Sequence, residues 1–96
     1  NITAVITSSD TQAISVMNQL RSMRLSVPAD ISVTCMGGSY LTLYYAPSIS
    51  GIISPSYEIG KVAANKIIDL ISRKTIRPSH SIVDYSFFEG DSISSL

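Results

Sequence analysis

The stretch ITAVITSSDTQAISVMNQL at residues 2–20 changes its hydrophobic period partway along and decides the fold class. Its first part, residues 2–8, is a short β-branched run that predicts a buried strand. From Asp10 onward the apolar side chains recur at helical spacing, which predicts a helix that fades near Leu25. Ser9 or Asp10 would cap this helix, because a short side-chain oxygen can accept an amide hydrogen of the first turn.

The rest of the chain repeats this alternation of strand and helix. Further elements are predicted, in chain order, at residues 30–36 (a strand broken by Gly37 and Gly38), 40–45 (one or two helical turns), 49–53 (strand), 55–73 (helix) and 81–88 (strand). The resulting order, β-α-β-(short α)-β-α-β, predicts an α/β fold with a mostly parallel sheet. The serine-rich tail from Gly90 to Leu96 is expected to be loose.

The predicted helix at residues 55–73 has the clearest pattern in the sequence. Ser54 is expected to be its N-cap, with Pro55 at the first helical position, where a missing N–H costs nothing. Asp69 would pair with Arg73 one turn later. One face of this helix is an apolar stripe made of Ile59, Val62, Ala63, Ile67, Leu70 and Ile71.

Composition narrows the classes of function. The chain has 96 residues, of which 45% are hydrophobic and 15% charged, so we expect something outside it to cover part of its apolar surface. An ordinary small domain with a large apolar core is the alternative. Lys and Arg balance Asp and Glu, which argues against a nucleic-acid-binding surface. No stretch is apolar and long enough to span a bilayer, and the chain enters a strand directly, as expected of a piece of a longer protein.

Residues that carry catalysis or bind cofactors are scarce. His80 stands alone in a loop without a nucleophile to serve, so an ordinary surface histidine is expected. Gly37 and Gly38 lack the third glycine of a dinucleotide-binding motif and indicate a turn. Cys35 has no partner cysteine, so we expect a buried reduced thiol, which fits a reducing cytosol. We therefore expect no enzyme activity, no cofactor and no metal site.

One group of residues does suggest binding. Ser8, Ser9 and Asp10 stand where the first strand ends, and ligands of open α/β sheets collect outside the carboxyl ends of the strands. The Asp10 carboxylate could accept hydrogen bonds from ligand hydroxyl groups; simple capping of the helix is the alternative. Residues that follow the next two strands would face the same edge: Gly37, Gly38, Ser39, Ser54 and Ser56.

Several phrases of the sequence resemble the lactose-repressor (LacI/GalR) family of bacterial transcriptional regulators. In that family a strand ending in Asn-Asp opens a helix, and the phrase Val-Pro-x-Asp-Ile-Ser-Val leads into the next strand. The matching phrases here are TAVITSSD at residues 3–10, VPADISV at 27–33, PSISGI at 47–52, YEIG at 57–60 and FEGDS at 88–92. The resemblance runs almost end to end, and the VPADISV phrase is quite specific.

This resemblance implies the C-terminal portion of a two-lobed, periplasmic-binding-protein-like effector domain, which holds a sugar or another small molecule in its cleft. Residues 1–53 and 81–88 would belong to the second lobe, residues 54–80 would cross to the first lobe, and residues 89–96 would be the tail. The family's helix-turn-helix would lie upstream of this chain, so DNA would be a partner only through that domain. A cytoplasmic location without a membrane partner is implied as well.

The resemblance also suggests particular residues. Asp10 matches the family's ligand-binding aspartate, with Ser9 in place of the preceding Asn. Gly37 and Gly38 stand where the family has polar side chains, and Ser54 matches its contact after the third strand. These departures imply an unusual effector, fewer polar contacts, or a regulator without a ligand.

The family's second lobe carries much of a homodimer interface. Tyr40, Tyr44 and Tyr45 would suit that role, since Tyr is favoured at interfaces. Packing of these rings on the lobe's own sheet is the alternative.

Two other classes of function stay open. An upstream signal peptide or lipid anchor would indicate one lobe of an extracellular sugar-binding transport protein. Detectable turnover would indicate a small flavodoxin-like enzyme.

Overall fold

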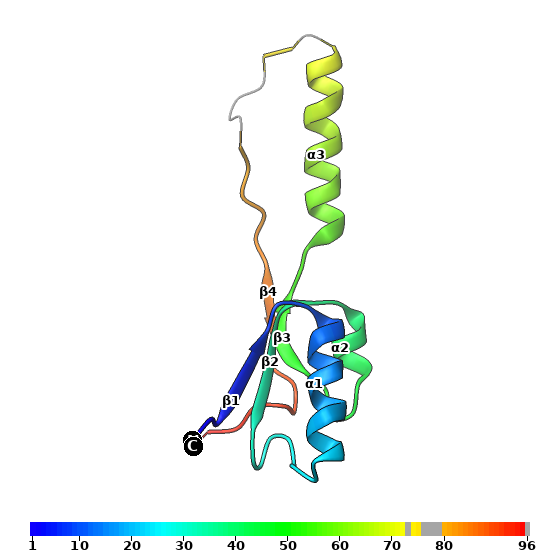
Figure 1. Cartoon of the computed structure of the whole chain (residues 1–96). Helices are drawn as coiled ribbons and strands as arrows, with labels where there is room; N and C mark the ends of the chain where they lie inside the picture. Colours follow the sequence, from blue (N-terminus) through cyan, green and yellow to red (C-terminus); the bar gives the residue numbers. More distant parts are fainter. Residues whose placement is uncertain (73, 76–79, 96) are drawn as a thin grey trace. The chain divides into compact units, whose positions relative to one another are not determined.

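A computed structural model describes residues 1–72, 74–75 and 80–95 of the chain (Figure 1). Its elements are β1 (Ala4–Thr7), α1 (Asp10–Ser22), β2 (Ser32–Gly38), α2 (Tyr40–Tyr44), β3 (Ser50–Ile53), α3 (Ser56–Ile71) and β4 (Ser86–Phe88). The strands are hydrogen-bonded in the order β1-β2-β3-β4; the first three are parallel, and β4 is antiparallel to β3. The predicted α/β order and the mostly parallel sheet are therefore confirmed.

The chain divides into two compact units, which are described separately. The sheet unit comprises Asn1–Ser54 and Ser86–Leu96, and the α3 unit comprises Pro55–Tyr85. Along the part of the chain that the structure describes, no helix is both long and apolar enough to cross a membrane.

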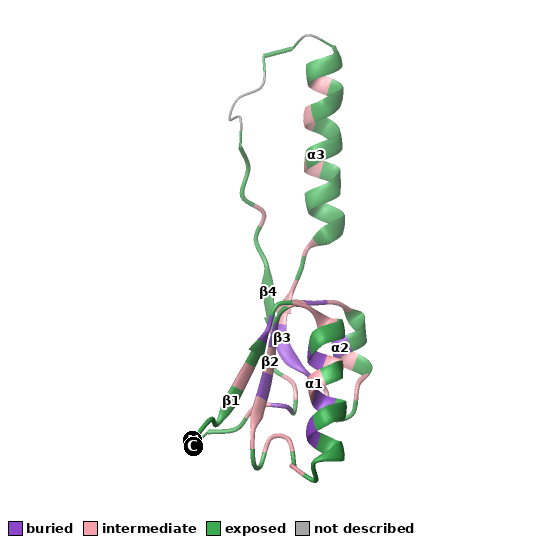
Figure 2. Cartoon of the chain, in the orientation of Figure 1, coloured by how far each residue is buried: buried purple, intermediate pink, exposed green. Residues whose placement is uncertain are grey.

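The core of the sheet unit lies between α1 and one face of the sheet (Figure 2). Apolar residues at helical spacing on α1 meet residues that alternate along β2, and each large side chain buried in this way contributes about 1.5–3 kcal/mol to stability. The buried set is Ala13, Met17, Leu20, Val33, Cys35 and Ile49. Cys35 is a free thiol inside this core, as predicted.

The prediction that Gly37 and Gly38 break the second strand is wrong, because β2 continues through both. A Cβ atom on Gly37 would lie 2.6 Å from the carbonyl oxygen of Ser8, so glycine allows the chain after β1 to approach β2 closely. An irregularity between Cys35 and Gly38 then lets Gly38 pair with Ile53. Glycine here serves a close approach of two backbones and not a turn.

The prediction of a loose C-terminal tail is also wrong for residues 90–95, whereas Leu96 lies outside the described residues. Ser92 is completely buried; its hydroxyl donates to the carbonyl oxygen of Val33 at 2.6 Å and accepts from the amide of Ser50 at 2.8 Å. The amide of Val33 donates back to the carbonyl oxygen of Ser92. Because β3 begins only opposite Thr34, the tail gives Val33 the backbone partner that β3 does not supply.

The last strand is shorter than predicted. Residues 81–88 were expected to be extended throughout, but only Ser86–Phe88 pair with a neighbour, opposite Gly51, Ile52 and Ile53. β3 itself ends at Ile53, so the earlier residues have no partner strand within the described part of the chain.

The α3 unit holds the long helix, which begins one residue later than predicted. Pro55 is the N-cap and makes no side-chain cap bond, so Ser54 is not the cap. The reason is that the amide of Ser54 still bonds the carbonyl oxygen of Gly38, which keeps Ser54 at the end of the sheet. Asp69 forms an ion pair with Lys74 at 3.6 Å; its predicted partner Arg73 lies outside the described residues.

The apolar stripe of α3 is uncovered. No residue of this helix is buried, and Ile67 and Ile71 are 56% and 76% exposed (Figure 2). The predicted loop at residues 76–80 lies outside the described part of the chain except for His80, which is exposed. The predicted stripe is therefore present on the helix, and that something outside the chain covers it stays a prediction.

Candidate ligand-binding site

The carboxyl ends of the three parallel strands bring the predicted site residues to one edge of the sheet. Gly37 lies against the Ser8 carbonyl oxygen, and the amide of Ser54 donates to the carbonyl oxygen of Gly38 at 3.3 Å. Asp10 begins α1 immediately after β1, and Ser39 precedes α2 immediately after β2. These backbone contacts hold the end of each strand within reach of its neighbour.

The structure separates the roles of Ser9 and Asp10. Ser9 is the N-cap of α1: its hydroxyl accepts from the amide of Gln12 at 3.4 Å and also bonds the hydroxyl of Thr11. Asp10 is the first helical residue, where a negative charge is favoured by the helix dipole. Its carboxylate Oδ1 accepts from the amide of Thr11 at 2.7 Å. Capping by Ser9 leaves the second oxygen of Asp10 for another contact.

That contact is Ser39, whose hydroxyl donates to Asp10 Oδ2 at 2.5 Å. Ser39 is also the N-cap of α2, because its hydroxyl accepts from the amide of Leu41. Sequence reasoning placed Ser39 on this edge but missed the bond. A serine just before a short helical segment was the available signal for a cap.

Only one charged side chain, Asp10, is present among the edge residues Ser8, Ser9, Asp10, Gly37, Gly38, Ser39 and Ser54. The serines among these residues have hydroxyl groups, and the glycines have only backbone N–H and C=O groups. Such an edge can accept hydrogen bonds from hydroxyl groups of a neutral ligand and offers no cation to an anion. Within residues 1–72, 74–75 and 80–95, no group of His, Cys, Asp or Glu side chains could hold a metal ion.

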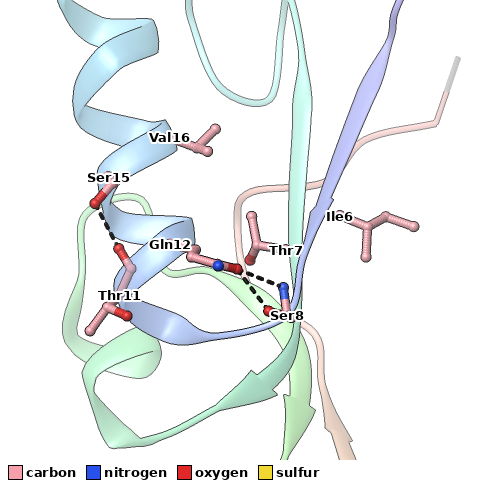
Figure 3. Close-up of a pocket in the computed structure, with 7 residues that line it drawn as sticks. All are labelled: Ile6, Thr7, Ser8, Thr11, Gln12, Ser15 and Val16. Atoms are coloured by element: carbon pink, nitrogen blue, oxygen red, sulfur yellow. Dashed lines mark hydrogen bonds between the residues drawn. The ribbon is translucent and has the colours of Figure 1, made fainter.

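An open hollow of about 450 Å³ lies beside β1 (Figure 3); it shares Ser8 with this edge, but Asp10 is not among the residues that line it. Several of its polar groups bond one another: the Gln12 side-chain oxygen accepts from both the amide and the hydroxyl of Ser8, and Ser15 donates to the carbonyl oxygen of Thr11. The hollow is lined by Ile6, Thr7, Ser8, Thr11, Gln12, Ser15 and Val16. Because no charged side chain lines the hollow, it offers ligand hydroxyl groups weaker acceptors than the Asp10 carboxylate does.

The three tyrosines of the predicted interface divide into two kinds. Tyr45 packs against the core of its own unit, its hydroxyl donates to Asn18 Oδ1 at 2.6 Å, and Arg21 lies over its ring. Tyr40 and Tyr44 are 73% and 84% exposed on α2. The alternative of internal packing therefore describes Tyr45, and two rings remain on the surface.

Comparison with known proteins matches residues 2–93 to the family described as the periplasmic binding protein-like domain. Two curated relatives are the HTH-type transcriptional regulator RegA of Clostridium acetobutylicum, 30% identical over 91 residues, and the probable HTH-type transcriptional repressor ExuR of Bacillus subtilis, 32% identical over 91 residues. Each alignment covers 95% of this chain and 27% of the relative. The chain thus spans about a quarter of the length of these relatives.

Solved structures show the same fold. The transcription regulator CcpA of Lactococcus lactis superimposes with a TM-score of 0.90 at 23% identity, over 96% of this chain and 34% of that one. A periplasmic binding protein/LacI transcriptional regulator from Alkaliphilus metalliredigens, complexed with D-xylulofuranose, gives a TM-score of 0.87 at 18% identity, over 96% of this chain and 35% of that one.

The mostly parallel sheet, together with the match over residues 2–93, defines the class: periplasmic binding protein-like domains. Within that class, the chain belongs to the LacI/GalR family of transcriptional regulators.

Proposed function

We propose that this chain is the effector-sensing and dimerising part of a LacI-type transcriptional regulator, with a sugar or sugar-like effector. The observation that carries the proposal is the half-buried Asp10 carboxylate at the carboxyl edge of the parallel sheet. Ligands of open α/β sheets bind at this edge, and a carboxylate makes strong bonds to ligand hydroxyl groups. Ser9, Gly37, Gly38 and Ser54 complete the proposed contacts, through backbone groups at the glycines.

The facing wall of the cleft is proposed to come from a first lobe outside this chain. Residues 1–53 and 81–88 would form part of the second lobe, residues 54–80 would cross to the first lobe, and residues 89–96 would be the tail. The division of the chain after Ser54 supports the first boundary of this assignment, whereas residues 81–85 fall in the α3 unit and not in the sheet unit. The exposed stripe of α3 supports it too, since such an apolar face needs a cover.

The proposed dimer surface is the exposed face of α2, with Tyr40 and Tyr44 at its centre. Exposed aromatic rings next to Leu41, itself 57% exposed, form an apolar patch of the kind that interfaces bury. Tyr45, which follows α2 directly, would help to fix the position of this surface through its hydrogen bond to Asn18. DNA would be bound only by a helix-turn-helix outside this chain, in the cytoplasm.

Thermal shift of the full-length regulator against sugars, phosphosugars and nucleobases tests the effector proposal. We expect a neutral polyhydroxylated compound to raise the melting temperature, and Asp10→Ala to abolish that rise. Asp84→Ala is the matched control, because it removes an exposed carboxylate of the α3 unit. An effector whose stabilising effect survived Asp10→Ala would show that the site lies elsewhere.

A lobe of an extracellular sugar-binding transport protein would share this fold. The names of the curated relatives favour the regulator, since these relatives are described as HTH-type regulators and not as transport proteins or enzymes. The upstream reading frame distinguishes the two: a helix-turn-helix is expected, and a signal peptide or lipid anchor would contradict the regulator.

A further inference from the structure

We propose that Ser39 is a positioning residue, which fixes the Asp10 carboxylate in the orientation that receives the effector. The inference rests on the proposed function of Asp10 and adds the residue through which that side chain is aimed. Asp10 and Ser39 are 29 residues apart in sequence, and their contact joins the first residue of α1 to the N-cap of α2.

The direction of each hydrogen bond is determined. A carboxylate can only accept, so the Ser39 hydroxyl donates its hydrogen to Asp10 Oδ2. That hydroxyl must then accept in its bond with the amide of Leu41, at 3.2 Å. The result is a chain from amide to hydroxyl to carboxylate, in which Ser39 has one arrangement of its hydrogen.

The backbone of Ser39 is held as well. Its carbonyl oxygen accepts from the amide of Thr42 at 3.1 Å and from the hydroxyl of Thr42 at 2.7 Å. Thr42 is buried, at 1% exposure. Ser39 is therefore a rigid donor, which can impose an orientation on its partner.

The Asp10 carboxylate keeps capacity for a ligand. Oδ1 accepts from the amide of Thr11 and Oδ2 from Ser39, which is one protein bond for each oxygen. A carboxylate oxygen can accept about two bonds, so each retains a lone pair. Since Ser9 caps α1, the bond to Ser39 is not needed for capping and serves to orient the side chain.

Ser39 has this role because the preceding residues cannot. Gly37 and Gly38 carry no side chain, and a Cβ atom on Gly37 would meet the Ser8 carbonyl oxygen at 2.6 Å. Ser39 is the first residue after the irregular end of β2 that has a side chain to offer. Gly37 and Gly38 thus offer no side chain at this edge, and the Ser39 hydroxyl acts there through Asp10.

Crystal structures of the full-length protein test the orientation without any ligand. Ser39→Ala and Ser39→Gly both remove the hydroxyl, and glycine is itself accepted at an N-cap, so α2 is retained in at least one variant. We expect Asp10 to turn away or to occupy more than one rotamer in both, and to stay in place in Ser39→Thr. Ser22→Ala is the control, because it removes a hydroxyl bonded to Gln19 at the far end of α1. An unchanged single orientation of Asp10 in both Ser39→Ala and Ser39→Gly would overturn the proposal.

Calorimetric titration of the full-length protein with cellobiose and D-xylulose gives the second readout. Loss of an immobilised side chain should raise Kd by about tenfold in Ser39→Ala and leave Ser39→Thr near the parent. In an Asp10→Ala background, which has no side-chain acceptor for Ser39, Ser39→Ala should leave any residual binding unchanged; an additional loss there would contradict a role through Asp10. If neither sugar binds the parent protein, that counts against the proposed effector class, while the crystal structures still decide whether Ser39 positions Asp10.

Discussion

The hydroxyl of Ser92 donates to the carbonyl oxygen of Val33, at 2.6 Å, and so joins the C-terminal tail to the middle of the sheet unit across 59 residues of sequence. The hydroxyl oxygen of Ser92 also accepts from the amide of Ser50, so one buried hydroxyl satisfies backbone groups of two neighbouring segments. This tail is therefore part of the sheet unit.

Ser92→Ala should lower the free energy of unfolding by about 1–3 kcal/mol, because it leaves a buried amide and a buried carbonyl oxygen without this partner. Chemical denaturation measures the change. Ser95→Ala, at an exposed position of the same tail, should have almost no effect. Equal effects of the two substitutions would mean that the tail is not anchored through Ser92.

Two glycines should respond in opposite ways to alanine. Gly37→Ala places a methyl group 2.6 Å from the Ser8 backbone and should destabilise the protein by about 1–3 kcal/mol. Gly60→Ala meets nothing within 4 Å inside α3 and should stabilise it by about 0.5–1 kcal/mol. Thermal unfolding compares the two variants; a tolerated Gly37→Ala would contradict the close approach of β2 to the chain after β1.

These cases show how far the sequence could predict the fold. The start of α1 was predicted well because its apolar spacing and its cap are local signals, whereas the helix ends at Ser22, before the predicted end near Leu25. Gly37 and Gly38 were misjudged, since a turn and a close backbone approach use glycine equally; only contacts distant in sequence, with Ser8 for Gly37 and with Ile52 for Gly38, distinguish the two. Ser92 carried no periodic signal, because its burial depends on where β3 begins relative to β2.

The candidate site was also predictable only in part, because local signals place residues along the chain but do not show which of them meet. The position of Asp10 at a strand end follows from the chain's pattern, so it could be proposed from sequence. Its bond to Ser39 depends on how α1 and α2 meet, which no local pattern encodes. The internal packing of Tyr45 was likewise open until the contact with Asn18 was seen.

The isolated 96-residue chain should self-associate, or exchange α3 between copies, because the apolar stripe of α3 is uncovered. Light scattering over a range of concentrations measures this. Ile67→Gln combined with Ile71→Gln should increase the monomer fraction, whereas Ile2→Gln, which removes an exposed isoleucine of the sheet unit, should not. A compact, stable monomer at high concentration would contradict the prediction.

The proposed dimer surface predicts a contrast between neighbouring tyrosines. Tyr44→Asp should weaken the full-length dimer at least tenfold, since it puts a charge into an apolar contact. Tyr45→Phe should lose the bond to Asn18 and lower stability by about 1 kcal/mol without changing dimerisation. Analytical ultracentrifugation measures the dimer dissociation constant of both variants. An unchanged constant in Tyr44→Asp would place the interface elsewhere.

A crystal structure of the full-length regulator with the effector found by thermal shift would show directly whether Asp10 binds the ligand. We expect a ligand hydroxyl within hydrogen-bond distance of the Asp10 carboxylate, with the backbone of Gly37 or Gly38 at the same edge. A ligand seated instead in the hollow beside β1, against Gln12 and Ser15, or held without any contact to Asp10, would contradict the account.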